Sequence, residues 1–491
     1  MAGIAGVLYA DSAEKDTLAD RMLDTVRHRG PDNREVHKDG RFSGGVGAQD
    51  LSTARGNGFA RSGKTVLFFD GEIYNERENG KSDAQVALEL YLEHGKVFPG
   101  YLEGVFACAV WDGTELLLAR GPVGVRPLFY GKTSEGTYVF ASEMKALIGV
   151  AEEVWELNPQ TVFSSESGVN GYVVRYPEVE MPSTPEAAAK KLREILFRSV
   201  EKRMADGALG GMLLSGGLDS SIIAAIANEI KPGIPAYTVG LKDGNAPDLE
   251  NAALMAGHLG VEHKVYHFSA TEIAEMVPEA VWKLESFDED CISGAISNLN
   301  ASALAAKDTN CIFSGEGGDE LFGGYHLLKD LPTEYERLKM MHKLVEIAYN
   351  TAVQRLDRGM MGNSLGYRTP FIDSEVIAFA LQVPVRWKIH RNEDGELIEK
   401  WILREAFRDL LPDKIYRRVK LRFSAGTGTD TVMDEIAEGK GYKEKFNENT
   451  RTTPGGYYLN SPKELWYYEL FKEKFPGLQF EKLVGRWDPN K

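Results

Sequence analysis

Residues 213–221, LLSGGLDSS, constrain the fold of this chain more than any other stretch of its sequence. The apolar run that ends at Leu214 predicts a strand, and SSIIAAIANEI (220–230) predicts a helix. Between them, Gly216 and Gly217 let the backbone turn sharply, and the start of the helix presents N–H groups to an anion. The stretch therefore predicts a strand–loop–helix unit that binds phosphate.

The polar residues of this loop favour one kind of phosphate ligand. A Walker A loop is excluded, because its GxxxxGK[ST] spacing and its lysine are absent. Ser215, Ser220 and Ser221 offer hydroxyl groups to phosphate oxygens. Asp219 would repel a bare phosphate but suits a Mg²⁺ ion that bridges to pyrophosphate. We therefore predict a magnesium–pyrophosphate site.

Two further stretches, SGEGGDELFGGY (314–325) and RRVKLRFSAGTG (417–428), carry charged residues that suit the same ligand. SGEGGDELFGGY (314–325) also follows a predicted strand, and Asp319 in it is a candidate second Mg²⁺ ligand. The carboxyl ends of parallel strands meet at one edge of a sheet, so we expect the two loops to lie together. Glu316, flanked by glycines, is expected to project into the same cleft, and Lys420 to neutralise a leaving pyrophosphate.

The length of 491 residues predicts two domains. Residues 1–175 read as short strands between Gly, Asp and Ser breaks, with a helix over 82–95, which predicts an α+β or sandwiched-sheet domain. The proline-rich and acidic stretch 176–192 indicates a linker. Over 186–491, alternating strands and helices predict a parallel sheet covered by helices, followed by a helical, charged C-terminal part.

Net charge and composition indicate which binding partners and which cellular compartment to expect for this chain. A net charge of −16 argues against nucleic acid or an anionic membrane as the main partner. Cys108, Cys291 and Cys311 are the only cysteines, and none forms a CxxC pair, which is typical of a reducing compartment. No signal-peptide pattern and no apolar run of ~20 residues is present. We expect a cytoplasmic protein.

The chain resembles the asparagine synthetase B family over essentially its whole length. That family joins an N-terminal-nucleophile glutaminase domain to a PP-loop synthetase domain. The resemblance thus implies an α+β N-terminal-nucleophile-type sandwich over 1–175 and an α/β PP-loop parallel-sheet domain with a helical C-terminal part over 186–491. The motifs that carry it are RHRGPD (27–32), GEIYN (71–75), FASEMKAL (140–147), SGGLDSS (215–221), SGEGGDELFGGY (314–325), YRTPFID (367–373), KWILREAF (400–407) and RRVKLRFSAG (417–426).

The resemblance implies a two-step reaction with ATP and Mg²⁺. A substrate carboxylate would be adenylated with release of pyrophosphate, and a nitrogen nucleophile would then displace AMP to form an amide. Glu316 matches the family's glutamate that handles the attacking nitrogen, and Lys420 would lie beside the phosphates, while Asp219 and Asp319 would hold Mg²⁺. The positions that match the ATP-binding residues are Leu213, Ser215, Gly216, Gly217, Asp219, Ser220, Val239 and Gly315.

The glutaminase motifs depart from the family pattern. Ala2 stands where the family has its nucleophilic cysteine and cannot form a thioester. Asp50 aligns with the arginine that binds the glutamine carboxylate, and Asp70, before Gly71, replaces the oxyanion-hole asparagine. Asp83, which would bind the glutamine ammonium, remains. Three losses at one site indicate natural degeneration rather than one engineered substitution, so we predict that this domain does not hydrolyse glutamine.

The synthetase half departs from the family at the aspartate pocket. Ser293 replaces an arginine, Ala352 replaces a cleft aspartate, and Gly366 replaces a glutamate. Each lost polar contact costs on the order of 1–3 kcal/mol when its partner stays buried and unpaired. We therefore expect a substrate carboxylate other than aspartate.

These observations predict an AMP-forming amide ligase whose nitrogen comes from ammonia or an amine. Three alternatives stay open: an ammonia-dependent asparagine synthetase in which Ala2 replaces the cysteine, a β-lactam-synthetase-like intramolecular cyclase, and a non-catalytic ATP-binding regulator. The relatives that close β-lactam rings carry tyrosine at the position of Glu316, which disfavours the cyclase. Family members often dimerise, so a homodimer is one expected state.

Overall fold

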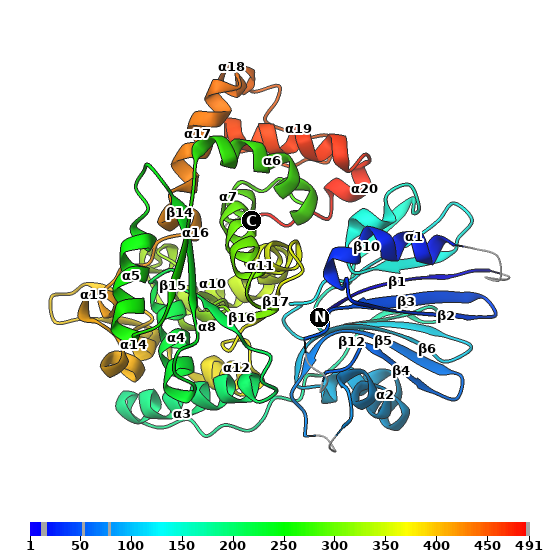
Figure 1. Cartoon of the computed structure of the whole chain (residues 1–491), viewed down its shortest axis with the longest axis horizontal. Coiled ribbons are helices and arrows are strands. Elements are labelled where there is room, and N and C mark those ends of the chain that lie inside the picture. The colour runs from blue at the N-terminus through cyan, green and yellow to red at the C-terminus, as the bar shows by residue number, and fades with distance from the viewer. Residues whose placement is uncertain (11–16, 52–54, 77–79, 488–491) are drawn as a thin grey trace.

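Three large sheets organise the molecule (Figure 1). The computed structural model describes residues 1–10, 17–51, 55–76 and 80–487. Two six-stranded antiparallel sheets form a sandwich in the N-terminal part, and a five-stranded parallel sheet forms the centre of the C-terminal part. The predicted fold class, an α+β sandwich followed by an α/β parallel-sheet unit and helices, is confirmed.

The two sheets of the sandwich enclose an aromatic core. Phe42 of the first sheet stacks on Trp111 of the second and on Phe140 of its own sheet, and it contacts Phe68 of the second at a tilt. The first sheet has the order β10 (Glu153–Glu156), β8 (Phe129–Lys132), β9 (Tyr138–Ala141), β1 (Ala2–Leu8), β3 (Phe42–Ala48) and β2 (Asn33–Asp39). The second has the order β12 (Gly168–Gly171), β11 (Thr161–Ser164), β7 (Leu116–Arg120), β6 (Gly104–Trp111), β5 (Thr65–Ile73) and β4 (Phe59–Ser62).

Helices cover the outer faces of both sheets. The first sheet packs under α1 (Leu18–Thr25), so β1 is buried on both faces and reads as an unbroken run of small and apolar residues. The second sheet packs under α2 (Asp83–His94), which begins with a capping box between Ser82 and Gln85.

The parallel sheet has the order β15 (His263–Phe268), β14 (Ala236–Leu241), β13 (Gly211–Leu213), β16 (Cys311–Phe313) and β17 (Gly366–Arg368). Strands β13 and β16 are neighbours although about one hundred residues separate them along the chain, a separation typical of crossover connections. The loops that follow these two strands therefore emerge side by side at one edge, as predicted.

Helices surround this sheet and fill the C-terminal part (Figure 1). None of the helices within the described residues is long and apolar enough to cross a membrane. The helices are α3 (Pro185–Met204), α4 (Leu218–Ile230), α5 (Pro247–Leu259), α6 (Ala270–Leu284), α7 (Glu289–Ala305), α8 (Gly318–Phe322), α9 (Leu327–Asp330), α10 (Glu334–Ile347), α11 (Ala352–Met361), α12 (Ser374–Gln382), α13 (Val385–Lys388), α14 (Trp401–Phe407), α15 (Asp413–Tyr416), α16 (Phe423–Thr427), α17 (Thr429–Gly439), α18 (Tyr442–Lys445), α19 (Pro462–Lys474) and α20 (Leu478–Glu481); a hairpin of β18 (Ile389–Arg391) and β19 (Leu397–Glu399) precedes α14.

A buried ion network joins the sandwich to the C-terminal part. Asp357 of α11 accepts hydrogen bonds from Arg29 at 2.7 and 3.1 Å and from Arg126 at 3.0 Å, and both arginines belong to the sandwich. Arg358 and Tyr367 donate to the same carboxylate. Burial alone would raise the pKa of Asp357, but the surrounding guanidinium groups hold it well below its usual range. Asp357 thus stays charged with its oxygens fully engaged.

A second ion network crosses the same interface. Arg368 of β17 donates to Glu72 of β5 at 2.8 Å and to Asp206, which follows α3, at 2.6 Å. Arg55 of the sandwich reaches the same Asp206 at 3.0 Å. Two carboxylates and two guanidinium groups thus compensate one another across the interface.

We expect Asp357→Ala to lower the free energy of unfolding by about 3–5 kcal/mol, because it leaves two buried arginines without their main counter-ion. Thermal and denaturant unfolding measure the loss. Asp24→Ala, which removes a surface ion pair with Arg34, is the matched control and should change stability by less than about 1 kcal/mol. Equal effects of the two substitutions would show that the buried network does not hold the halves together.

Candidate active site

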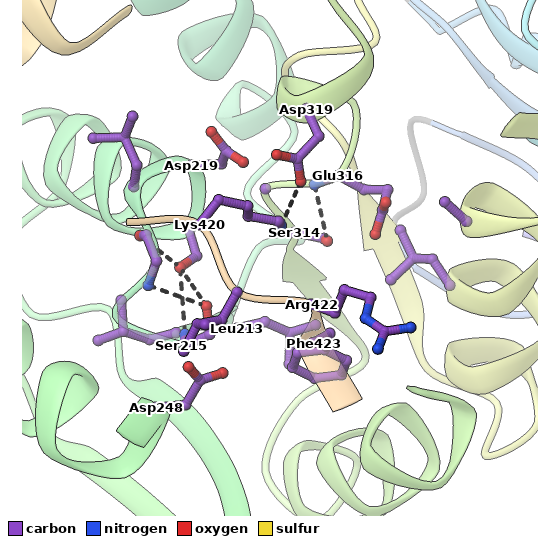
Figure 2. Close-up of a pocket in the computed structure, with 18 of the residues that line it drawn as sticks. Leu213, Ser215, Asp219, Asp248, Ser314, Glu316, Asp319, Lys420, Arg422 and Phe423 are labelled. Atoms are coloured by element: carbon purple, nitrogen blue, oxygen red, sulfur yellow. Dashed lines mark hydrogen bonds and ion pairs between the residues drawn. The ribbon is translucent and has the colours of Figure 1, made fainter. Parts of the chain in front are cut away.

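A cavity of about 460 Å³ opens at the carboxyl ends of β13, β14 and β16. Figure 2 shows residues from both predicted loops on its wall, with Ser215 and Asp219 from one and Ser314, Glu316 and Asp319 from the other. The segment that carries Lys420, Arg422 and Phe423 crosses over it.

Hydroxyl groups shape the loop after β13. Ser215 Oγ accepts a hydrogen bond from the Gly217 N–H at 3.2 Å and lies 3.1 Å from Ser220 Oγ. Gly216 adopts a positive φ of 65°, and a Cβ there would lie 2.3 Å from the backbone of Asn251. Gly216 therefore shapes the turn without lining the cavity, whereas Ser215, Gly217 and Ser220 line it.

Glycines in the second loop allow the two loops to touch. A Cβ on Gly315 would lie 2.7 Å from the backbone nitrogen of Ser220. A Cβ on Gly318 would lie 2.6 Å from Cγ of Asp219. Real Cβ atoms do not approach other atoms so closely, so the glycine-rich sequence is needed to bring Asp319 next to Asp219.

Two carboxylates and two lysines meet in the cavity. Lys400 Nζ lies 2.5 Å from both Asp219 Oδ2 and Asp319 Oδ1, and Lys420 Nζ lies 2.5 Å from Asp319 Oδ2. Burial alone would raise the pKa of Asp319, but the two ammonium groups hold it below its usual range. For Asp219, burial outweighs the lysines and raises the pKa.

This pair of carboxylates fits a Mg²⁺ ion that is shared with a phosphate ligand. Asp219 Oδ1 is buried and has no hydrogen-bond partner among the described residues, which leaves a ligand oxygen free. Within that part of the chain no three His, Cys, Asp or Glu side chains form a complete metal cage. One or two carboxylates completed by substrate phosphates are the usual way in which proteins bind Mg²⁺.

Three more of the predicted ATP-binding residues line the cavity. Leu213, Val239 and Gly315 all line it, from β13, β14 and the loop after β16. Arg418, which also lines the cavity, donates to the carbonyl of Ser215 at 2.9 Å.

Glu316 lines the part of the cavity that Arg355 and Asp290 also line. Its carboxylate lies 3.7 Å from Arg355, and Arg355 lies 3.5 Å from Asp290. Burial raises the pKa of Glu316, and the charges of Arg355 and Lys420 oppose that rise. Arg355 Nε has no hydrogen-bond partner among the described residues, so the guanidinium retains a donor within the wall. This side of the cavity suits a polar substrate and a proton acceptor.

The three residues predicted for the acyl pocket do not lie together. Ala352 lines the cavity, whereas Ser293 and Gly366 are absent from its lining. Ser293 is fully buried, and its carbonyl accepts a hydrogen bond from Thr429, because this turn of α7 faces α17. Gly366 lies on β17, where a Cβ would lie 2.9 Å from the side chain of Leu51. Of the three, Ala352 is the one in the cavity wall, and the assignment of all three to an acyl pocket stays a prediction.

The structure gathers most of the predicted glutaminase residues at the end of the sandwich that faces the C-terminal part. The Ala2 N–H donates to Asp70 Oδ1 at 2.8 Å, and Arg29 donates to Asp70 Oδ2 at 3.0 Å. Gly71, directly after Asp70, has a φ of 146°, and a Cβ there would lie 2.1 Å from the carbonyl of Val105. Both oxygens of Asp70 are thus engaged by the chain itself.

Asp83 and Asp50 differ in their surroundings. Asp83 is buried and forms an ion pair with Arg55 at 3.4 Å. Asp50 is exposed, and no hydrogen bond joins its side chain to the other predicted glutaminase residues within the described chain. Asp50 thus differs from Asp70 and Asp83, which are both buried.

Sequence reasoning missed three charged residues of the sites. Lys400 lies within the quoted motif KWILREAF, but its spacing from Asp219 gave no reason to pair them. Arg355 lies in a stretch without a glycine-rich or strand signal, and Arg55, although it precedes Gly56 and Gly58, has no spacing that pairs it with Asp83. Only the folded chain brings them to their carboxylate partners.

Comparisons with known proteins match both halves of the chain. A sequence profile described as asparagine synthase matches residues 191–343 and 333–476, and one described as a glutamine amidotransferase domain matches residues 1–167. The chain belongs to the asparagine synthetase family. Members of this family form amides with ATP, so the chain is assigned to the carbon–nitrogen ligases.

The similar proteins include two plant enzymes. A glutamine-hydrolysing asparagine synthetase of Zea mays is 29% identical over 99% of this chain and 88% of its own length. Asparagine synthetase 3 of Arabidopsis thaliana, also named as glutamine-hydrolysing, is 30% identical over 97% of this chain and 87% of its own length. Among solved structures, a glutamine phosphoribosylpyrophosphate amidotransferase from B. subtilis has a TM-score of 0.29 at 17% identity, covering 54% of this chain and 65% of that one.

We expect Gly318→Ala to weaken MgATP binding at least about tenfold, because its Cβ would push Asp219 out of the cavity. Isothermal titration with MgATP measures the loss. Gly257→Ala is the control, since nothing lies within 4 Å of a Cβ at that exposed position of α5. Unchanged affinity in Gly318→Ala would contradict the close approach of the two loops.

Proposed function

We propose that this protein is an AMP-forming amide ligase that adenylates a carboxylate other than aspartate and joins it to ammonia or an amine, without hydrolysing glutamine. The observation that carries this proposal is the single cavity in which Asp219, Asp319, Lys420 and Glu316 meet. Two carboxylates for Mg²⁺, a lysine for phosphate and a separate glutamate are the groups that adenylation and amide formation need.

The first step needs charge control at the phosphates. A substrate carboxylate oxygen attacks the α-phosphorus of ATP, and the bond to the pyrophosphate oxygen breaks. Asp219 and Asp319 would hold Mg²⁺, which neutralises phosphate charge when it is bound. Lys420, whose side chain is 28% exposed toward the cavity, is placed to accept the developing charge of the leaving pyrophosphate.

The second step needs a proton acceptor. The nitrogen nucleophile attacks the acyl carbon, AMP leaves with the electron pair of the broken C–O bond, and the nitrogen loses a proton. Glu316, which lines the cavity beside Arg355, would take this proton. Its raised pKa brings it nearer to neutrality, where a carboxylate is a more effective base.

The contacts that the glutaminase residues make within the chain itself support a nitrogen source other than glutamine. Ala2 offers no thiol, and Asp70 presents acceptors that are already bound to the Ala2 N–H and to Arg29. The carboxylate of Asp83, matched to the glutamine ammonium, lies against Arg55.

The acyl side of the cavity supports a substrate other than aspartate. Ala352 supplies no polar group where the family has an aspartate, and Ser293 lies outside the cavity. Asp290 and Arg355 supply charges of both signs there, so the acid that fits is one with further polar groups.

Pyrophosphate release with MgATP tests the proposal. We expect release with an acid other than aspartate and with ammonium or an amine present, together with a new amide detected by mass spectrometry. Glutamine should not replace ammonium, and Glu316→Gln should keep ATP binding but lose amide formation by at least about a hundredfold.

Two outcomes would contradict the proposal. Aspartate with ammonium yielding asparagine would identify an asparagine synthetase with a silent glutaminase half. ATP binding without pyrophosphate release across dicarboxylic, amino and aromatic acids would favour a regulator.

A further inference from the structure

Lys400 is the most deeply buried cation of the cavity. Its side chain is only 2% exposed, against 28% for Lys420. Its ammonium lies 2.5 Å from one oxygen of Asp219 and 2.5 Å from one oxygen of Asp319. A Mg²⁺ ion shared by these carboxylates would need oxygens at about 2.0–2.1 Å, within the same space. The lysine and the metal thus compete for one position.

The backbone of Lys400 is held in an unfavourable conformation. Its φ of 55° lies in the left-handed region, which a residue with a Cβ seldom adopts. Arg404 secures this turn through its backbone N–H to the carbonyl of Lys400 at 2.9 Å and through its Nε to the carbonyl of Glu399 at 2.9 Å. The strained backbone of Lys400 therefore directs its side chain toward Asp219 and Asp319.

A neighbouring glycine leaves space for the Lys400 side chain. A Cβ on Gly324 would lie 2.2 Å from Lys400 Cε, so only glycine leaves room for the lysine. Hairpin β18–β19 leads directly into Lys400, and α14 begins directly after it. The ammonium thus comes from the junction between this hairpin and α14, and not from the loops that carry the carboxylates.

The net charge of these side chains affects how a metal ion can bind. Asp219, Asp319, Lys400 and Lys420 together carry no net charge, so a divalent cation alone would leave a buried excess of positive charge. A nucleotide that brings phosphate charge with the metal removes that excess. The two lysines therefore disfavour binding of the metal ion alone much more than binding of the metal–nucleotide complex.

We infer that Lys400 is a stand-in cation that makes metal binding depend on nucleotide: its ammonium holds the two carboxylates together in the metal-free enzyme and is displaced when the metal arrives with ATP. This inference rests on the proposed function, because it takes Asp219 and Asp319 as the metal ligands. Lys400 is a positioning residue here.

Mn²⁺ titration followed by electron paramagnetic resonance tests the inference, with Mn²⁺ as the probe for Mg²⁺. Full-length wild type should bind Mn²⁺ weakly without nucleotide and tightly with α,β-methylene-ATP, after correction for the free metal–nucleotide complex. Lys400→Met should bind Mn²⁺ at least tenfold more tightly than wild type without nucleotide, and the difference made by nucleotide should shrink. Lys400→Arg should retain the wild-type behaviour, because it retains the charge.

A matched control separates this effect from a loss of stability. Lys463 is another buried lysine that bridges two carboxylates, Asp430 at 2.8 Å and Asp434 at 3.2 Å, and it does not line the cavity. Lys463→Met should lower the thermal midpoint without changing Mn²⁺ affinity. If Lys400→Met does not fold, Lys400→Gln is measured in the same way, and Mn²⁺ should raise its thermal midpoint more than that of wild type.

An unchanged or lower Mn²⁺ affinity in folded Lys400→Met, with wild type binding the nucleotide complex normally, would overturn the inference and leave the proposed function intact. Failure of wild type and Lys463→Met to bind the metal–nucleotide complex would instead overturn the proposed function.

Discussion

The carboxylate of Asp357 is the contact on which the arrangement of the two halves depends. It is buried, and it accepts hydrogen bonds from two arginines of the sandwich and from two groups of its own half. An isolated buried charge is costly, so each member of this network requires all the others in place. Because Arg29 also binds Asp70 and the Ala2 carbonyl, the same network reaches the residues that match the family's glutaminase site. The interface and that site are therefore one electrostatic unit.

The catalytic half uses charge in a different way. Its carboxylates lie at the edge of a cavity and are balanced by lysines rather than by arginine forks. An ammonium is a compact charge that can exchange for a metal ion or a phosphate, whereas a guanidinium with several fixed hydrogen bonds is suited to permanent pairing. Lysine pairing therefore suits a cavity that exchanges ligands, and arginine pairing suits an interface that stays closed.

The sequence predicted the parts of this picture that depend on local pattern. The glycine-rich loops after β13 and β16, their meeting at one sheet edge and the position of Glu316 follow from strand–loop–helix units and from the edge rule for parallel sheets. Lys420 was instead matched through the family resemblance. Ser293 could not be placed from sequence, because the rotation of one helical turn decides whether a side chain faces a cavity or a neighbouring helix. Arg55, Lys400 and Asp357 were beyond reach for another reason: a long-range ion pair leaves no periodicity or spacing in either segment.

Glutamine hydrolysis by the Ala2→Cys variant shows whether the N-terminal half lacks glutaminase activity for more reasons than its missing thiol. The substitution restores the missing thiol but leaves Asp70 bound to Arg29 and Asp83 paired with Arg55. Glutamate release from glutamine should therefore stay at the level of the unsubstituted chain, with or without MgATP and an acid substrate. Glutamine-dependent release of glutamate by Ala2→Cys, above that level, would contradict it and show that the site needed only its nucleophile.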